Sequence, residues 1–204
     1  MHLPKKGLRA LGIAESYTGR TYSTLAGVVM RKDLRIDGFC FGNVTVGGMD
    51  ATDTITGMVR GLQRKDLNAI LLSGCVISWF NVMDPGRIAE EFGVPVICVT
   101  YEASEGLAAD IAHHFPHDAR RQEAYQNLGE RTPVLLHTGR SVFIRAWNLS
   151  PDDAAQFCND FTLEGGIPEP LRVARLCARN IPFHDEPRLN GRSRRYFALK
   201  GDFK

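Results

Sequence analysis

The first residue whose type and position suggest chemistry is Glu15. It follows Leu11 and Ile13 on one face of an extended apolar segment, "RALGIAES". A carboxylate at the end of a buried strand costs free energy unless a partner compensates for its charge. That partner could be a cation on the protein, a backbone donor or a metal ion, and the neighbouring residues alone do not decide among the three.

Basic side chains gather near the carboxyl end of the chain. Residues 170–204 hold nine Lys/Arg against three Asp/Glu, although the net charge of the whole chain is only +2. Arg172 and Arg175 share one face of an amphipathic segment, and "GRSRRYF" places Arg194 and Arg195 beside two aromatic residues. Arginines for phosphates and aromatic rings for bases are typical of single-strand-binding surfaces. The pattern indicates an anionic partner, although a solvated helix and tail account for it as well.

The elements that must position these residues follow from the hydrophobic pattern. Three extended segments, at 8–16, 23–32 and 35–46, come first. In "DATDTITGMVRGLQR" the apolar residues recur at i, i+3, i+4 and i+7, which predicts an amphipathic helix. Continuous apolar runs at 67–75 and 94–100 predict buried parallel strands. A short helix lies between these runs, with Pro in its first turn and Gly at its end.

The rest of the chain predicts helices and one more strand pair. Helical patterns occur at 104–115 and 168–180, and a strand pair turns at Thr138–Arg140. Ser150 is a good N-cap for a further helix. We find no linker, so residues 1–204 are expected to form a single α/β domain, with a basic C-terminal helix and tail at about 167–204.

Composition limits the classes of protein to which the chain can belong. No run of 18 apolar residues occurs, so we expect no membrane span. The start of the chain lacks the apolar core of a signal peptide, so we expect a cytoplasmic protein. The five cysteines are widely spaced and form no CxxC motif. They are expected to be free thiols in a reducing compartment, and a zinc site is not supported.

The segments "IAES … AGVVMR … IDGF … GGMDATD … LLSG … FNVMD" resemble an uncharacterised family, catalogued as domain of unknown function ninety-nine, which is grouped with endonuclease V on fold. The similarity to endonuclease V itself covers about residues 8–107. The resemblance implies a ribonuclease H-like fold: a mixed five-stranded sheet flanked by helices, with a C-terminal αβ extension. In that fold the first three strands are antiparallel, and the first strand lies beside the fourth.

The resemblance also implies a metal site. Glu15 stands where endonuclease V has its first metal-binding aspartate, and Asp50 stands where the second acid begins a helix. Asp50 equally suits a helix N-cap. Asp53 lies on the other side of the helix, where its charge favours the helix dipole. We therefore expect Glu15 and Asp50, rather than Asp53, to share one cation, Mg²⁺ or Mn²⁺.

The chain departs from endonuclease V at three polar positions. Ser73-Gly74 stands where the fourth strand of that enzyme ends in Asp-Gly. Serine is a weak, neutral ligand for Mg²⁺, which prefers carboxylates and water. Trp79 replaces a histidine, and Tyr101 replaces a lysine that could meet the phosphate. Together these departures argue against the reaction of endonuclease V itself, which is hydrolysis near a deaminated base.

Other residues could replace the missing third acid. Asn81 and Asp84 follow the fourth strand and could fold back over its end. Asp84 also suits a cap for the helix that begins at Pro85. Glu102 follows the fifth strand, one strand further from Glu15, and ranks below Asp84.

Three functions fit these residues. The first is Mg²⁺-dependent phosphodiester cleavage, with Glu15 and Asp50 holding the ion and Asp84 or a water molecule replacing the lost acid. The second is non-catalytic nucleic-acid binding. The third is binding of a small molecule or a protein in a pocket beside Trp79 and Phe80. The basic end favours the first two, so we predict a nucleic-acid-linked function. Catalysis, substrate and oligomeric state stay open.

Overall fold

The computed structural model describes residues 7–17, 21–180 and 196–200. The first half of the described chain contains β1 (Arg9–Ser16), β2 (Tyr22–Arg31), β3 (Ile36–Thr45), α1 (Ala51–Leu62), β4 (Ala69–Ser73), β5 (Val76–Ile77), β6 (Asn81–Val82), α2 (Pro85–Phe92) and β7 (Val96–Thr100). The second half contains α3 (Ala108–His114), α4 (Ala119–Gln126), β8 (Thr132–Leu135), β9 (Ser141–Trp147), α5 (Pro151–Asp160), α6 (Glu169–Asn180) and β10 (Tyr196–Lys200).

The large sheet has the strand order β10-β3-β2-β1-β4-β7-β9-β8. Strands β1, β2 and β3 pair antiparallel, whereas β4 runs parallel to both β1 and β7. The ribonuclease H-like arrangement predicted from the sequence is therefore confirmed, with the first strand beside the fourth. The five predicted strands form its centre, and β8, β9 and β10 extend the two edges.

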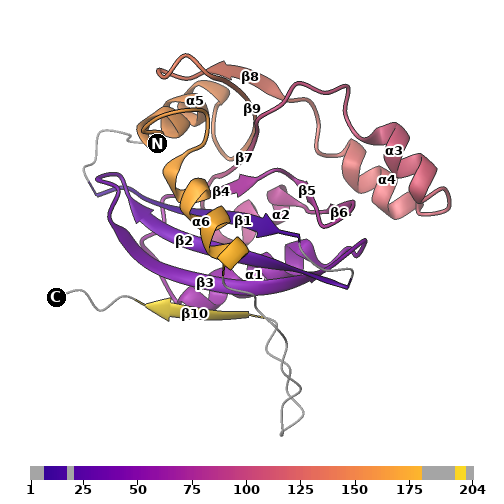
Figure 1. The fold of residues 1–204 in the computed structure, drawn as a ribbon, viewed down its shortest axis with the longest axis horizontal. Helices are drawn as coiled ribbons and strands as arrows, with labels where there is room; N and C mark the ends of the chain where they lie inside the picture. The colour runs from indigo at the N-terminus through magenta and orange to yellow at the C-terminus, as the bar shows by residue number, and fades with distance from the viewer. Residues whose placement is uncertain (1–6, 18–20, 181–195, 201–204) are drawn as a thin grey trace, which may run out of the picture.

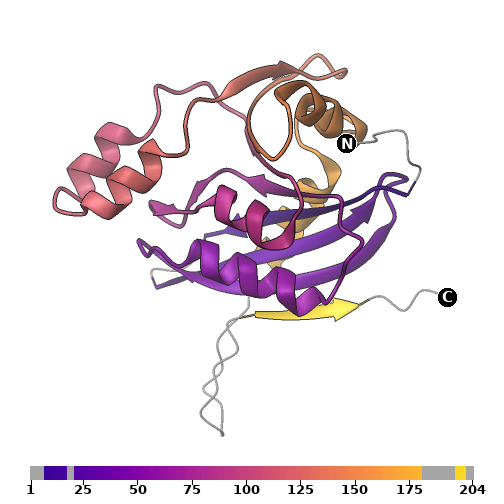
Figure 2. The ribbon, with the colours of Figure 1, turned by 180° about the vertical axis from the view of Figure 1, so that it is seen from behind.

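Helices cover both faces of this sheet. Figure 1 shows α6 lying across β1 and β2, and Figure 2 shows α1 and α2 on the opposite face. The alternation of side chains along β1 follows from this arrangement, because Leu11 and Ile13 pack in the core beneath α1 while Gly12 faces α6. A Cβ atom at Gly12 would overlap Pro170, so only glycine permits α6 to approach the strand.

The α3–α4 hairpin projects beyond the end of the sheet (Figure 1). No helix in the described part of the chain is long and apolar enough to cross a membrane.

All five cysteines are free, as the sequence predicted. Burial raises the pKa of the Cys40 and Cys158 thiols to about 12, so these groups stay protonated and unreactive.

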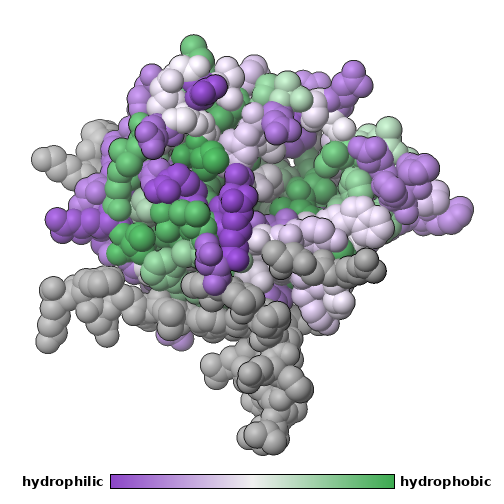
Figure 3. Space-filling model, viewed as in Figure 1, coloured by the Kyte–Doolittle hydropathy of each residue, from purple (hydrophilic) through white to green (hydrophobic). Residues whose placement is uncertain are grey.

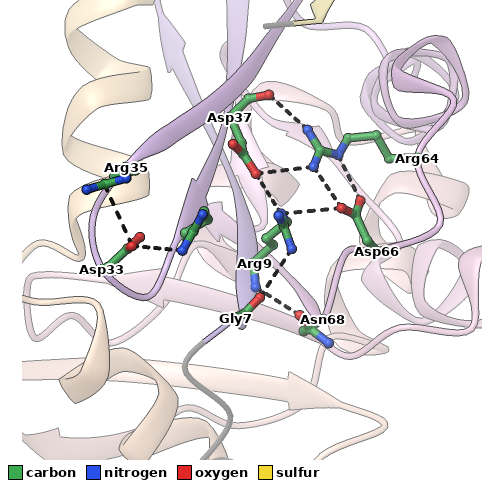
Figure 4. Close-up of polar contacts among 9 residues, drawn as sticks. Gly7, Arg9, Asp33, Arg35, Asp37, Arg64, Asp66 and Asn68 are labelled. Atoms are coloured by element: carbon green, nitrogen blue, oxygen red, sulfur yellow. Dashed lines mark hydrogen bonds and ion pairs between the residues drawn. The ribbon is translucent and has the colours of Figure 1, made fainter. Parts of the chain in front are cut away.

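A network of ion pairs fastens the end of the sheet at which β1 and β4 begin (Figure 4). The Nε atom of Arg9 donates to Asp37 on β3 at 2.6 Å. Arg64 follows α1 and donates to the same Asp37 oxygen at 3.3 Å. It also donates two hydrogen bonds of 2.8 Å to the carboxylate of Asp66. The network therefore joins β1 and β3 to the connection between α1 and β4.

The arginines of this network change the acidity of its carboxyls. Burial alone would raise the pKa of Asp37, but hydrogen bonds and attraction from Arg9 and Arg64 outweigh it and lower the pKa. Hydrogen bonds from Arg64 also hold the pKa of Asp66 below its ordinary value. Both groups therefore stabilise the fold as carboxylates.

Asp37→Asn should lower the free energy of unfolding at pH 7 by about 1–2 kcal/mol, because it removes the shared acceptor of Arg9 and Arg64. A lowered pKa contributes stability above the ordinary aspartate value of 3.8. The difference between wild type and variant should shrink as the pH falls below that value and vanish below the pKa of the folded state. Urea denaturation between pH 2.5 and 7 measures it.

The control is Asp33→Asn. Asp33 pairs with Arg31 and Arg35 on the exposed β2–β3 turn. This change should alter stability by less than about 0.5 kcal/mol. An equal effect of the two substitutions would contradict the role given to the Asp37 network.

Candidate active site

Glu15 is the last residue but one of β1 and lies on the same face as Ile13, beneath α1, as the period of the strand predicted. Its carboxylate accepts hydrogen bonds from the backbone N–H of Ser78, at 3.0 and 3.1 Å, and from the Ser78 hydroxyl at 2.7 Å. The Ser23 hydroxyl on β2 donates to the same oxygen as the Ser78 hydroxyl. Most of these bonds fall on Oε1, so Oε2 keeps more of its capacity to bind a further partner.

Asp50 occupies the N-cap position of α1, but its side chain does not cap the helix. The carboxylate turns to the end of β3, where it accepts from the Thr45 hydroxyl at 2.8 Å and from the Thr45 N–H at 3.1 and 3.2 Å. The amide of Asn81 donates to it at 2.7 Å. Asn81 also accepts from the N–H of Ala51 at 3.1 Å, so Asn81 serves the helix end in place of Asp50.

The turn Ser78–Asn81 connects the two acids. Ser78 at its start orients Glu15, and Asn81 at its end orients Asp50. The three residues Ser78, Trp79 and Phe80 all have positive φ, at 43°, 54° and 64°. Such a run is rare for residues with a side chain and costs about 1–2 kcal/mol for each residue. Contacts elsewhere must hold the turn in this conformation.

Arg121 supplies these contacts from α4. Its side chain is nearly fully buried, and its guanidinium donates to the carbonyls of Gly47, at 2.8 Å, and Gly48, at 3.0 Å. It also donates to the carbonyl of Phe80. A single cation therefore ties the β3–α1 loop, which leads into Asp50, to the left-handed turn that orients Glu15.

The charge of Arg121 is itself compensated. The guanidinium lies 3.9 Å from the centre of the Phe115 ring and forms a 3.0 Å ion pair with Asp118. The backbone N–H of Arg121 and then its guanidinium lower the pKa of Asp118, so this partner is a carboxylate at neutral pH. The sequence did not reveal Arg121, because its helix is mostly polar and the carbonyls that it binds lie more than 40 residues away.

Two other acids considered from the sequence, Asp84 and Asp53, both interact with α2. Asp84 is the N-cap of α2 and accepts from the N–H of Arg87 at 3.0 Å. This is the capping role that the sequence offered as its alternative. Asp53 is exposed and pairs with Arg87 at 2.8 Å. Its carboxylate therefore points toward α2, and it lies apart from Asp50 as the helical spacing predicted.

Ser73 and Gly74 stand between Glu15 and a larger cavity. Together with Glu15 they line a small cavity of about 10 Å³, and they also line a neighbouring cavity of about 520 Å³. The Ser73 hydroxyl accepts a 3.1 Å hydrogen bond from Arg175 on α6. Arg172, on the same helix, is held by Glu169 through bonds of 2.7 and 2.8 Å. The predicted binding residues Arg194 and Arg195 lie outside the described residues.

Exposed aromatic rings surround the end of β1. Tyr17 follows the strand, Tyr22 begins β2, and Trp79 lies at the tip of the left-handed turn. Each is more than half exposed, and only three aliphatic side chains join them as large exposed apolar groups in the described part of the chain. Trp79 contacts His114 and Phe115 at ring-centre distances of 5.7 and 5.8 Å, which fixes one side of its ring.

The donor set suits a hard cation. Mg²⁺ binds through one or two carboxylates and completes its shell with water and substrate phosphates. Glu15 and Asp50 supply two carboxylates, with hydroxyl and amide groups around them. The described residues contain no group of three or more acidic, histidine or cysteine side chains placed to bind a metal. Oxygen donors of this kind are the ligands that a hard cation prefers.

Comparison with known proteins identifies the family. The family model for Endonuclease dU matches residues 6–182. This chain belongs to the Endonuclease dU family. A UPF0215 protein of Pyrobaculum calidifontis is 37% identical over 176 residues, which cover 84% of this chain and 95% of that protein.

Solved structures place the Endonuclease dU family within a wider fold. The crystal structure of a protein of unknown function from Archaeoglobus fulgidus matches with a TM-score of 0.75 and 27% identity, over 85% of this chain and 98% of that one. Endonuclease V of Ciona intestinalis, solved with a 24mer DNA containing an inosine, matches with a TM-score of 0.57 over 85% of each chain. At 14% identity this second likeness shows the shared fold. The likeness to endonuclease V that the sequence indicated is thus confirmed at the level of the fold.

Arg121→Met should lower the free energy of unfolding by about 3 kcal/mol, because three main-chain carbonyls lose a charged donor while the packing on Phe115 is largely kept. Hydrogen exchange of the Ser78 and Asn81 amides should accelerate, because the left-handed turn loses its restraint.

The matched control is Arg120→Met, at the exposed neighbour on the same helix. Urea denaturation should show a change within about 0.5 kcal/mol for it. Unchanged exchange in the turn of the Arg121 variant would show that other contacts maintain the left-handed conformation.

Proposed function

We propose that this member of the Endonuclease dU family binds nucleic acid at the end of β1 and cleaves a phosphodiester bond there with the help of Mg²⁺ or Mn²⁺. One observation carries the proposal: a single turn, Ser78–Asn81, orients both Glu15 and Asp50 at the same end of the sheet. The family assignment and the fold shared with endonuclease V support it.

In this proposal Glu15 and Asp50 hold the ion through their carboxylate oxygens. A divalent cation bound there would act as a Lewis acid that stabilises the negative charge developing on the phosphate. Ser78 and Ser23 fix the orientation of Glu15, while Thr45 and Asn81 fix that of Asp50. The ligands are therefore held in place before an ion or a substrate arrives.

The exposed rings of Tyr17, Tyr22 and Trp79 would receive the bases of the strand. A base stacked on an aromatic side chain contributes about 1–3 kcal/mol of binding free energy and requires no particular sequence. The name of the family makes deoxyuridine-containing DNA the first substrate to test. DNA containing inosine is the second, because endonuclease V was solved with such a strand.

Non-catalytic nucleic-acid binding is the second candidate. It is favoured by Ser73, a neutral side chain hydrogen-bonded to Arg175, at the position where the resemblance to endonuclease V places a third acid. A protein of this kind would bind the same strands without cutting them.

Glu15→Gln and Asp50→Asn should each reduce Mg²⁺-dependent cleavage by about 100-fold or more, because each removes half of the carboxylate charge that holds the ion. The measurement is gel analysis of labelled oligonucleotides that contain deoxyuridine, inosine or only ordinary bases, with Mg²⁺ and with Mn²⁺. Titration calorimetry of each ion, with the uncut oligonucleotide present, should show saturable binding that both variants lose.

Asp53→Asn is the matched control, since it removes a carboxylate from the same helix outside the site. It should keep both ion binding and cleavage. Binding of the oligonucleotides without cleavage of any of them by the wild type would support the non-catalytic alternative.

Trp79→Ala should weaken binding of a single-stranded oligonucleotide by about 10-fold, because the base opposite the ring loses its stacking partner. Fluorescence anisotropy of a labelled strand measures the change. Leu163→Ala, at an exposed apolar residue between α5 and α6, is the control and should have no effect. An unchanged affinity of the Trp79 variant would mean that the strand does not cross this turn.

A further inference from the structure

The 520 Å³ cavity beyond Ser73 contains an unusual concentration of positive charge. It lies at the ends of β4 and β7, and three arginines line it: Arg131, Arg145 and Arg175. They come from three separate elements, namely the segment before β8, strand β9 and helix α6. Figure 3 shows the corresponding face hollowed between α6 and the α3–α4 hairpin.

These three arginines differ from most others in the described part of the chain. Eight arginines within the described ranges form ion pairs with carboxylates, among them Arg9, Arg64 and Arg121. Arg131, Arg145 and Arg175 have no such partner among the described residues. Glu102 is the one acidic residue that lines the cavity, and it forms no ion pair with any of them.

Neutral contacts nevertheless hold each guanidinium in place. Arg175 donates to Ser73 and lies 5.1 Å from the centre of the Tyr101 ring. Arg145 uses its Nε atom to bind the carbonyl of Gly129 at 2.8 Å, which leaves both terminal NH₂ groups for another acceptor. Arg131 binds the carbonyls of Glu102 and Ser104, and its guanidinium lies 5.1 Å from the centre of the Phe143 ring.

Fixed cations without counter-charges are suited to an anionic ligand. Several guanidinium groups around one cavity repel one another, and an oxyanion relieves that repulsion. Arginine forks match phosphate oxygens in pairs, and such charge-assisted bonds are among the strongest hydrogen bonds in proteins. The cavity is also within the usual size range of ligand sites.

The position of the cavity indicates where the phosphate comes from. Ser73 and Gly74 line both this cavity and the small one that Glu15 lines, so the arginines lie on the far side of one short segment from Glu15. A strand whose scissile phosphate lies at Glu15 and Asp50 can therefore carry a neighbouring phosphate into the cavity. Val76, Val99 and Leu107 provide an apolar wall for the attached sugar.

We propose that Arg145 and Arg175, supported by Arg131, form a subsite for a backbone phosphate of the nucleic-acid strand, next to the phosphate at the two acids. The choice of a nucleic-acid strand as the ligand of this subsite rests on the proposed function. It assigns to Arg175 a direct contact with the ligand, and it adds Arg145, which the sequence gave no reason to select.

The test is the double variant Arg145→Gln/Arg175→Gln, compared with Arg140→Gln/Arg179→Gln. The control removes the same charge from the same two parts of the chain, the β8–β9 hairpin and α6, at exposed residues outside the cavity. Anisotropy of a labelled single-stranded oligonucleotide is measured between 50 and 300 mM NaCl without divalent ions. Thermal melting confirms that each variant is folded, and Arg145→Lys/Arg175→Lys keeps the charge but removes the fork.

The cavity variant should lose affinity about 10-fold or more at low salt, and its slope of log K against log salt should flatten by about 0.7, the value for one phosphate of a single strand. The control should keep the wild-type slope, with less than a threefold loss. The lysine variant should keep most of the slope but bind less tightly, because it lacks paired hydrogen bonds.

Other outcomes separate this subsite from the proposed function. Equal slopes and affinities for the cavity and control variants would overturn the subsite, even if Glu15→Gln still abolished cleavage. Failure of the wild type to bind any strand would also overturn it. Titration with inorganic phosphate would then show whether the arginines hold a free anion instead. The expected arginine effect on binding, without cleavage by the wild type, would keep the subsite and reject the catalytic proposal.

Discussion

The hydrogen bonds from Arg121 to three main-chain carbonyls are the interaction on which the rest of the candidate site depends. The turn at Ser78, Trp79 and Phe80 has a left-handed backbone that these residues do not favour by themselves. A buried guanidinium joins that turn to the β3–α1 loop, and Asp118 and Phe115 compensate for its burial. The α3–α4 hairpin, which lies beside the sheet rather than in it, therefore shapes the site through one side chain (Figure 1).

The neutral donors around the two acids complement this restraint. Glu15 and Asp50 each accept several bonds from hydroxyl, amide and backbone groups, so their orientations are set by the fold. Asn81 both serves the N-terminus of α1 and binds Asp50, which turns the carboxylate away from the capping role that its position would otherwise give it. A ligand set that is oriented in advance loses little conformational freedom when it binds.

The parts of this arrangement that the sequence predicted are those governed by local periodicity. The alternation in β1 placed Glu15 on the face of Leu11 and Ile13, and the helical spacing of α1 separated Asp50 from Asp53. The parts that it did not predict depend on contacts between distant segments. Trp79 and Phe80 are residue types that give no sign of a left-handed turn.

The three arginines of the cavity were not predicted as a group for the same reason, because they meet only through contacts between distant segments. Arg131, Arg145 and Arg175 are separated by 14 and 30 positions along the chain, and no periodic pattern relates them. Only the order of the strands, which brings β9 beside β7 and lays α6 across β1, places them around one cavity. Arg172 and Arg175 look alike on a helical face, yet Glu169 neutralises the first while the second reaches Ser73.

The charges on the two sides of Ser73, the Glu15 carboxylate on one side and arginines on the other, connect the two proposals. Two carboxylates would neutralise one divalent ion, whereas a third would leave the site negative and repel a phosphate. With fewer charged ligands the ion is held less tightly by the protein alone, because affinity follows ligand charge. Arginines placed beyond Ser73 would offset this by attracting the strand itself. On this reasoning, ion and phosphate bind together, and each supplies part of the charge that holds the other.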